Sequence, residues 1–226
     1  MENRAEADFA TMLAAVRRSV GTLARVSAPL PADRLIVLAA MAQNGGALRW
    51  ASPALQADKE VVLAAVRQDG AALFWASDGL RDDRTVVLAA VAQDGRALAD
   101  ASPALQADRT VVLTAVRQDG RELGHADPAL RDDRSVVLAA VCQHAAALEW
   151  ASPALRADRT VVLAAVAQHG WALQWASTEL RADPGVVLAA AVATAARDTP
   201  PACDGPSLRL AGMRSAMNAA FLYVLG

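Results

Sequence analysis

The chain has 226 residues, of which 54% are hydrophobic and only 4% aromatic, so its core must be packed mainly from small aliphatic side chains. Its 22 basic and 24 acidic residues give a formal net charge of -2. This balance argues against nucleic acid as the main partner, because proteins that neutralise phosphates are normally basic. The apolar runs are shorter than the roughly 18 residues that a membrane span needs, so we expect a soluble protein with no membrane span.

The N-terminus and the cysteines bear on the cellular compartment. The opening MENRAEADFATMLAAVRRSV carries acids ahead of its apolar stretch, whereas targeting segments are basic and poor in acids. We therefore expect no targeting segment in this sequence; a transit peptide already removed is the alternative. Cys142 and Cys203 lie in different sequence contexts and make no disulfide framework. This usage favours an intracellular reducing compartment, the cytoplasm by default.

A 25-residue repeat organises most of the chain. The stretch DRTVVLAAVAQDG at 83–95 returns nearly unchanged at 108–120 and 158–170. Steps of 25 residues connect eight aspartates, each followed by a leucine five residues later and an alanine seven residues later: Asp8, Asp33, Asp58, Asp83, Asp108, Asp133, Asp158 and Asp183. Such a period indicates units that bury their apolar faces against their neighbours. It predicts a helical repeat array over 1–196, with a diverged first copy.

Each copy is expected to begin with a long helix. Asp58 is a good N-cap for a helix over 59–69, since a short acceptor precedes a run of helix formers. This helix is apolar on most sides, so we expect it to be sandwiched between neighbouring copies. Gly70 is expected to end it as a left-handed C-terminal residue. The equivalent glycines are Gly45, Gly95, Gly120 and Gly170.

A short second helix and a third helical turn are expected to complete each copy. An acid such as Asp69 is unfavourable at the C-terminal end of the long helix. Its presence there is explained if it caps a second helix, AALFWA. In other copies the equivalent caps would be Asn44, Asp94 and Asp119. A Ser or Asp followed by Pro then gives the usual start of a helical turn; the alternative is a plain β-turn. These pairs are Ser52-Pro53, Ser102-Pro103, Asp127-Pro128 and Ser152-Pro153.

The C-terminal part departs from the repeat. The segment 197–207 is rich in Pro and predicts a loop, and 208–226 has apolar residues on or near one helical face. Because a solenoid needs an atypical end to cover its core, we expect 208–226 to be a C-terminal capping helix. No segment alternates polar and apolar residues over a strand's length. The predicted fold is therefore all-α, an alpha-solenoid of about eight 25-residue helical repeats with a C-terminal capping helix.

The repeat unit resembles a known family. Its pattern, D-[KR]-x-V-V-L-A-A-V-x-Q-x-G-x-A-L-x-W-A-S-x-x-L-x-x-D, is similar to the short helical repeat named domain of unknown function 4116. The resemblance covers roughly Asp33 to Val192, and the first copy loosely. It implies tandem copies of the kind found in bacterial and protist or algal proteins. It implies no established activity, so it assigns no functional residues.

Residues suited to catalysis or metal binding are few. His144 and His169 lie at equivalent positions of adjacent copies, with Cys142 nearby, but no four-ligand zinc set has the usual spacing. The simpler interpretation is that both histidines replace Asp or Asn at a helix end, where a cation suits the dipole. A catalytic pair of Asp100 and His125 lacks a Ser or Cys nucleophile at that position. We expect no enzymatic activity, no metal and no cofactor.

Two columns of polar residues are expected to be structural; a column is one position of the repeat followed through successive copies. Recurring glutamines are expected to bond helix-end carbonyls to the neighbouring copy: Gln43, Gln68, Gln93, Gln118, Gln143 and Gln168. A basic residue follows each cap aspartate: Arg34, Lys59, Arg84, Arg109, Arg134 and Arg159. Since each lies beside an acid, these residues predict a solvated, charge-balanced rim.

Three columns vary while the rest of the copy stays fixed, and repeat proteins use such a shared surface for binding. The most informative column reads Trp50, Trp75, Asp100, His125, Trp150 and Trp175. A buried change from Trp to Asp would leave a cavity and a buried acid, so we expect this column to be at least partly exposed. The copies with Asp100 and His125 also have small preceding residues, Ala99 and Gly124. They predict a polar notch for a partner's side chain or helix end; the alternative is that neighbouring side chains fill the gap.

These features favour a non-enzymatic protein–protein interaction scaffold, or an accessory subunit of a larger assembly, with a protein partner. The candidate contact surface comprises Trp50, Trp75, Arg96, Asp100, Arg121, Glu122, His125, Trp150, Trp171 and Trp175. One alternative is a repeat-based nucleic-acid reader, whose variable sites should be rich in polar and aromatic residues beside a basic groove. Here those sites include Gly, Ala and Glu. A regulatory module of an enzyme is the other alternative.

Overall fold

The computed structural model describes residues 34–42 and 44–198. These residues form α-helices and 3-10 helices with no strand among them, which confirms the predicted all-α repeat fold. The diverged first copy and the capping helix at 208–226 lie outside the described residues. The loop predicted at 197–207 is wrong at its start, because residues 197 and 198 still belong to the last described helix, α14 (Pro184–Asp198); the rest of it lies outside the described residues. None of the helices in the described ranges combines the length and the apolar character that a membrane crossing needs.

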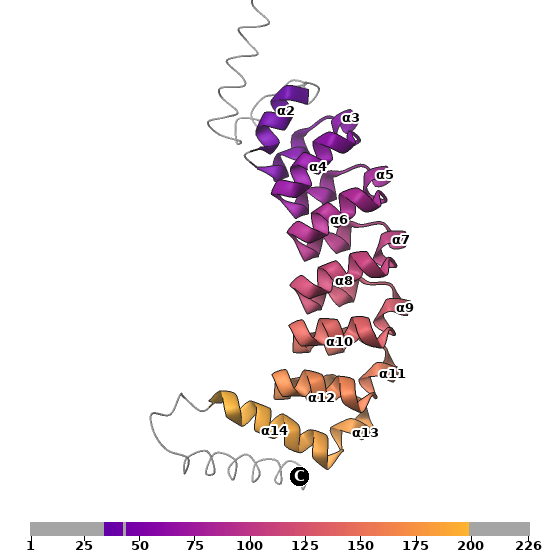
Figure 1. The fold of residues 1–226 in the computed structure, drawn as a ribbon, viewed down its shortest axis with the longest axis vertical. Helices are drawn as coiled ribbons and strands as arrows, with labels where there is room; N and C mark the ends of the chain where they lie inside the picture. The colour runs from indigo at the N-terminus through magenta and orange to yellow at the C-terminus, as the bar shows by residue number, and fades with distance from the viewer. Residues whose placement is uncertain (1–33, 43, 199–226) are drawn as a thin grey trace, which may run out of the picture. The chain divides into compact units, whose positions relative to one another are not determined.

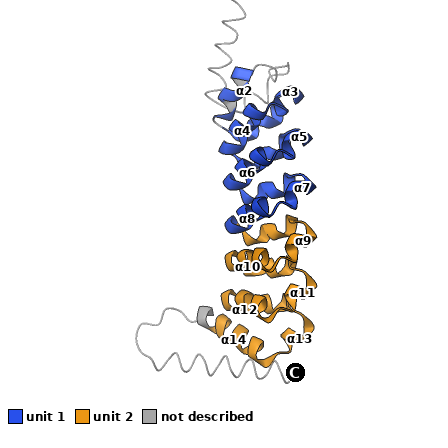
Figure 2. Cartoon of the chain, turned by 45° about the vertical axis from the view of Figure 1, so that its right-hand side comes forward, with its two compact units in different colours: residues 1–118 blue, residues 119–226 orange. Residues whose placement is uncertain are grey.

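The chain divides into two compact units, residues 1–118 and 119–226, coloured blue and orange in Figure 2. The described part of unit 1 contains α2 (Arg34–Met41), η3 (Gly45–Trp50), α3 (Pro53–Gln56), α4 (Lys59–Gln68), η4 (Gly70–Trp75), α5 (Asp78–Arg81), α6 (Arg84–Gln93), η5 (Gly95–Asp100), α7 (Pro103–Gln106) and α8 (Arg109–Gln118). The described part of unit 2 contains η6 (Gly120–His125), α9 (Pro128–Arg131), α10 (Arg134–Gln143), η7 (Ala145–Trp150), α11 (Pro153–Arg156), α12 (Arg159–Gln168), η8 (Gly170–Trp175), α13 (Thr178–Arg181) and α14 (Pro184–Asp198).

The long helix of each copy begins at the predicted aspartate. Asp58 lies just before α4, and its Oδ1 accepts hydrogen bonds from the backbone N–H groups of Glu60 and Val61 at 2.9 and 3.2 Å. Asp108 does the same for Thr110 and Val111 at 2.8 and 3.1 Å. These bonds satisfy amides that have no partner inside the helix. The predicted N-caps are therefore confirmed.

The short second helix of each copy is a 3-10 helix. In η4, Asp69 is the N-cap, and its Oδ1 accepts from the N–H of Ala71 at 3.1 Å, as predicted. The bonds at its two ends run over three residues, from Ala72 N–H to the Asp69 carbonyl and from Ala76 N–H to the Leu73 carbonyl, each at 3.0 Å. A 3-10 helix has three residues per turn, so residues three apart lie on one line.

The Ser-Pro pairs start a third helical turn, not a plain β-turn. Ser52 precedes α3, a four-residue helix, and its side chain accepts from the N–H of Leu55. Asp127 plays the same part before α9 by accepting from Ala129 at 2.8 Å. In both units, turns are also tied to the copy before them; the N–H of Ser77 donates to the carbonyl of Gln56, and that of Ser152 to the carbonyl of Arg131, each at 2.9 Å.

The core of each unit lies between stacked long helices, with the short turns α3, α5 and α7 along one side in unit 1 (Figure 1). In unit 1, α4 packs against α2 and α6; in unit 2, α12 packs against α10 and α14. On α4 the fully buried side chains are Val61, Val62, Ala65 and Val66. Burying one valine stabilises the fold by about 1.5 kcal/mol or more. The expectation of a helix sandwiched between neighbours is confirmed.

The repeated glycine has a different role from the predicted one. Gly70 is the first residue of η4, and its backbone lies outside the left-handed region, so the predicted left-handed helix end is wrong. A Cβ there would lie 2.6 Å from the carbonyl oxygen of Ala90 in the next copy. The glycine lets the backbones of neighbouring copies approach closely, although the copy that begins at Asp133 has Ala145 at this position. The same correction holds for Gly45, Gly120 and Gly170.

Candidate functional site

The three variable columns lie on the exposed side of the 3-10 helices. In η4 the first, third and fourth residues are buried, whereas the second, fifth and sixth (Ala71, Phe74 and Trp75) are exposed. The cause is the threefold turn, which places the second and fifth residues on one line. We call the second, fifth and sixth residues of the 3-10 helices in one unit its variable face. In unit 1 they are Gly46, Arg49, Trp50, Ala71, Phe74, Trp75, Arg96, Ala99 and Asp100; in unit 2 they are Arg121, Gly124, His125, Ala146, Glu149, Trp150, Trp171, Gln174 and Trp175.

The tryptophan column is at least partly exposed in every described copy, as the sequence predicted. Trp75 and Trp150 are 37% and 42% exposed, and His125 is also exposed. Trp50, Asp100 and Trp175 are half-buried. Substitutions in this column therefore cost the core little, which explains why neighbouring copies can differ here.

An arginine and three aromatic rings form a cluster on the variable face of unit 1. The Arg49 guanidinium carbon lies 4.7 Å from the ring centroid of Trp50 and 5.7 Å from that of Trp75. Phe74 meets Trp75 edge to face, with ring centroids 4.8 Å apart, and is 56% exposed. Both distances from Arg49 are within the range of a cation–π interaction.

A second aromatic cluster lies on the variable face of unit 2. Trp171 and Trp175 pack edge to face with centroids 4.8 Å apart, and the ring of His169 lies 5.3 Å from that of Trp171. Trp171 is 44% exposed. Its ring is thus held on two sides while much of its surface stays open to solvent.

The notch that Asp100 and His125 are predicted to form together stays a prediction, because Asp100 belongs to unit 1 and His125 to unit 2. Within unit 2, however, Gly124 does not leave an open space. A Cβ there would lie 3.0 Å from the two fusion carbons of the Trp150 indole. The small residue therefore makes room for a neighbouring ring, which agrees with the alternative interpretation on that side.

The prediction that Glu122 lies on the rim of the contact surface is wrong. Glu122 is only 7% exposed, because it is the third residue of η6, a position that faces the core. Its Oε2 lies 3.8 Å from Nε2 of His125. The sequence held a signal for this burial, since the equivalent residues in the other described copies are alanines: Ala47, Ala72, Ala97, Ala147 and Ala172.

Arg96 and Arg121 are exposed, as the sequence predicted. Arg121 already has a partner in its own copy, because its Nη2 lies 2.6 Å from Oδ2 of Asp119. The hydrogen bond from this guanidinium, together with the bond from its backbone N–H, holds the pKa of Asp119 below its usual value. Arg121 is therefore partly committed to a cap residue.

The recurring glutamines join neighbouring copies, as predicted. In unit 1, Gln118 donates from Nε2 to the carbonyls of Val91 and Ala92 at 2.8 and 2.7 Å. In unit 2, Gln168 donates to the carbonyl of Cys142 at 2.6 Å. The sequence did not reveal a second bond made by these glutamines. Their side-chain oxygen accepts from the glycine amide of the previous copy, as Gln118 Oε1 does from Gly95 at 2.9 Å.

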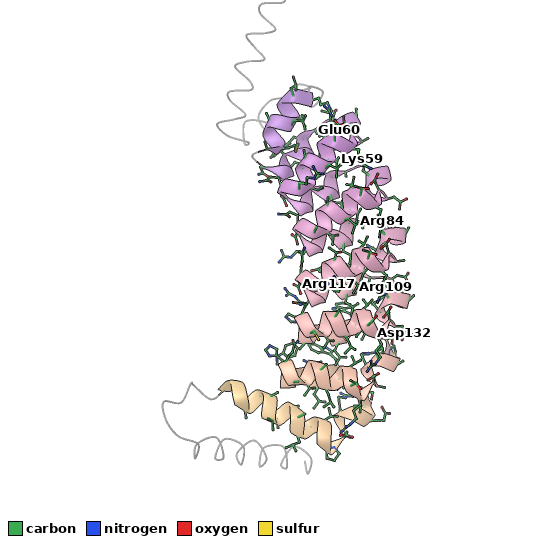
Figure 3. The ribbon with its side chains drawn as sticks, in the orientation of Figure 1. Lys59, Glu60, Arg84, Arg109, Arg117 and Asp132 are labelled. Atoms are coloured by element: carbon green, nitrogen blue, oxygen red, sulfur yellow. The ribbon has the colours of Figure 1, made fainter. Side chains whose placement is uncertain are left out.

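The charged rim is a chain of ion pairs between successive copies. In unit 1, Lys59 Nζ lies 2.6 Å from Oδ2 of Asp83, and Arg84 Nε lies 2.8 Å from Oδ2 of Asp108. Figure 3 shows Lys59, Arg84 and Arg109 at the same end of successive long helices. Hydrogen bonds from these cations lower the pKa of Asp83 and Asp108. The predicted balanced rim is confirmed, although Lys59 and Arg84 bond the next copy's acid and not their sequence neighbours.

Of the two histidines at helix ends, His144 acts as a side-chain cap, whereas His169 lies at the same position before η8 and makes no side-chain cap bond. Nδ1 of His144 accepts from the N–H of Ala146 at 3.1 Å, so it replaces Asp as the acceptor that starts η7. At His144 the expected role as a cation at a helix C-terminus therefore gives way to that of an N-cap acceptor. In the described ranges, no three His, Cys, Asp or Glu side chains are grouped so that they could hold a metal ion.

The sequence profile of one protein family, described as domain of unknown function (DUF4116), matches five overlapping segments: residues 33–81, 58–106, 83–131, 108–156 and 133–181. Together they cover most of the chain. The chain belongs to the DUF4116 family. Successive DUF4116 matches start 25 residues apart, so their step is the repeat found in the sequence and in the fold. No curated protein and no solved structure matches the chain.

Proposed function

We propose that the chain is a non-enzymatic protein-interaction module, a scaffold or an accessory subunit of a larger assembly, which binds its partner through the variable face. One observation carries the proposal. Within each 3-10 helix, most residues that differ between copies are exposed or half-buried, with Glu122 and Ala145 the exceptions at buried positions. The scaffold thus keeps its packing while its surface varies, as repeat proteins that bind other proteins do.

The chemistry of the variable face suits a protein partner. Phe74, Trp75, Trp150 and Trp171 are large apolar side chains with 37–56% of their surface exposed. Aromatic residues are enriched in protein interfaces, and a few buried tryptophans and arginines often supply most of the binding energy. Each unit offers both kinds of anchor, because Arg49 and Arg121 lie on the same faces.

The variable face is also built on a rigid support. Asp69 caps η4, Leu73 buries its inner side, and the Gly70 amide is bonded to Gln93 in the next copy. A surface that is already ordered loses little conformational entropy when it binds. The invariant residues of the repeat therefore hold the variable face in a fixed conformation, which favours binding of a partner.

Affinity capture from the source organism, quantified by mass spectrometry, tests the proposal. Two variants replace face residues, Phe74→Ser with Trp75→Ser in unit 1 and Trp150→Ser with Trp171→Ser in unit 2. The matched control, Leu188→Ser with Val192→Ser, removes exposed apolar side chains of α14, which lies outside the variable face. A partner should bind at least about tenfold less to one face variant and equally well to the control. If every captured protein binds equally to the unmodified chain, the two face variants and the control, the proposal is wrong.

A further inference from the structure

In unit 1, two tryptophans of successive copies already hold a cation from the chain itself. Trp50 and Trp75 end the 3-10 helices η3 and η4, and the Arg49 guanidinium lies within 6 Å of both rings. The planar guanidinium is attracted by the electron-rich faces of the indoles. The sixth residues of two neighbouring copies can therefore share one arginine.

Unit 2 repeats the tryptophan pair but reverses the charge beside it. Trp150 and Trp175 end η7 and η8, which pack against each other. The position of Arg49 is taken by Glu149, which is exposed. Glu149 has no hydrogen-bond or ion-pair partner among the residues that the structure describes. The unit thus offers two indoles and a free carboxylate where unit 1 supplies its own cation.

The indole of Trp150 is fixed with one side open. Its two ring-fusion carbons lie equally close to the Cβ position of Gly124, which places one face of the ring against the glycine backbone. The side chain is nevertheless 42% exposed. Trp175 is held by its edge-to-face contact with Trp171. Both rings are therefore supported before any ligand arrives, which lowers the entropy cost of binding.

We propose that Trp150, Trp175 and Glu149 bind an arginine side chain that a partner protein presents. The inference rests on the proposed function and names the partner's chemistry. A guanidinium satisfies both parts of the site, since it can stack on an indole face and donate two hydrogen bonds to a carboxylate. A neutral apolar side chain would leave the carboxylate of Glu149 without a partner.

The test uses the full chain with its tryptophan indole nitrogens labelled for NMR, and a blocked peptide, acetyl-Gly-Arg-Gly-amide. The arginine peptide should shift the indole signals of Trp150 and Trp175 in a saturable way. A peptide with citrulline, the neutral counterpart of arginine, should bind at least about tenfold more weakly. Equal binding of both peptides, or no shift at Trp150 and Trp175, overturns the proposal.

Charge exchange between the two units sharpens the test. Glu149→Arg places a cation where unit 1 has one, so it should abolish the response of Trp150 and Trp175. Arg49→Glu should create a new response at Trp50 and Trp75. Glu179→Arg is the matched control, because Glu179 is an exposed acid of α13 outside the variable face; it should bind as the unmodified chain does. A Glu149→Arg chain that still binds the peptide overturns the proposal.

The outcome can be separated from that of the proposed function. If a captured partner is lost in the variant with Trp150→Ser and Trp171→Ser but binds normally to Glu149→Arg, the arginine inference falls and the interaction function stands. If the peptide binds as expected and the same partner is lost in Glu149→Arg, both are supported. If no captured partner depends on either variable face, the proposed function falls whatever the peptide does.

Discussion

The backbone amide of Gly70 donates a hydrogen bond to Oε1 of Gln93 in the next copy, across an N···O distance of 2.6 Å. Gln93 in turn donates from Nε2 to the carbonyl of Gln68 at 3.3 Å. A Cβ on Gly70 would approach the Ala90 carbonyl oxygen to 2.6 Å. The two recurring residue types therefore form one junction, in which the glycine allows the approach of two copies and the glutamine bonds them.

Replacement of the junction glycine should destabilise the chain. In Gly70→Ala, the new Cβ meets backbone atoms of the next copy, so the stack must shift at a cost of about 1–3 kcal/mol. Gly79→Ala is the control in the same copy, because a Cβ there meets open space in α5. It should be neutral or stabilising by up to about 1 kcal/mol. Chemical denaturation measures both, and equal stability of the two variants would contradict this role of Gly70.

Removal of the junction glutamine should expose the glycine amide. Gln93→Leu leaves the part-buried N–H of Gly70 without its acceptor, at a cost of about 1–3 kcal/mol. Gln93→Glu keeps an acceptor oxygen and loses only the donor to Gln68, so it should cost less. Hydrogen exchange followed by NMR should show lost protection at Gly70 in the first variant and retained protection in the second. Identical protection in both would show that this bond does not hold the junction.

The local elements of the fold were predictable because the residues that form them are close in sequence. Asp58 and Ser52 cap helices that begin at the next residue, so their roles depend on geometry over two or three residues. The role of Gly70 was not predictable in this way. A left-handed turn and a close backbone approach both favour glycine, and the position of the next copy distinguishes them at Gly70.

The candidate site was predictable only in part. The alternation of Trp with Asp100 and His125 showed that the column is exposed, because a core position would not accept such changes. The contact of Arg49 with two indoles depends on the rotation of one copy relative to the next, which no spacing in the sequence specifies. The burial of Glu122 did have a signal, the alanine column in which it stands.

The stability of the chain should fall in acid. Asp83, Asp108 and Asp158 have pKa values below their ordinary value of 3.8, with the hydrogen bond from the preceding copy's Lys or Arg as the largest cause. A carboxyl group whose pKa is lowered in the folded state stabilises it fully above the ordinary value and loses that contribution as the pH falls through the lowered one. The melting temperature should therefore be steady from about pH 7 to about pH 5 and fall below about pH 4.

Variants of Asp108 separate its ion pair with Arg84 from its role as a helix cap in the loss of stability in acid. Asp108→Asn keeps the cap acceptor for Thr110 and Val111 but removes the titrating charge that faces Arg84, so its melting temperature should fall less steeply in acid. Asp108→Ala also removes the cap, at a further cost of about 1 kcal/mol. Two results would contradict a contribution of the Arg84–Asp108 ion pair: a melting temperature that rises in acid, or an equally steep fall with pH in the Asp108→Asn and unmodified chains.

Two whole copies should be removable. Deletion of Asp58 through Ala107 joins Ala57 to Asp108 and preserves the 25-residue register. Since each copy is stabilised mainly by its neighbours, the shortened chain should stay helical and melt cooperatively. Deletion of 58–95 is the control, because it breaks the register and leaves α-helical apolar faces unmatched. Circular dichroism melts compare them; aggregation of the in-register chain would contradict a modular repeat array.

Oxidative footprinting of the five tryptophans, with and without a captured partner, tests most directly whether the variable face is the binding surface. In the free chain, Trp75, Trp150 and Trp171 should be modified readily, since they are the most exposed. Alkylation of Cys142, exposed on α10 outside the variable face, is the internal control. The account predicts that the partner protects the tryptophans of at least one unit and leaves Cys142 reactive. Unchanged oxidation of all five tryptophans in the complex, with protection elsewhere on the chain, would contradict it.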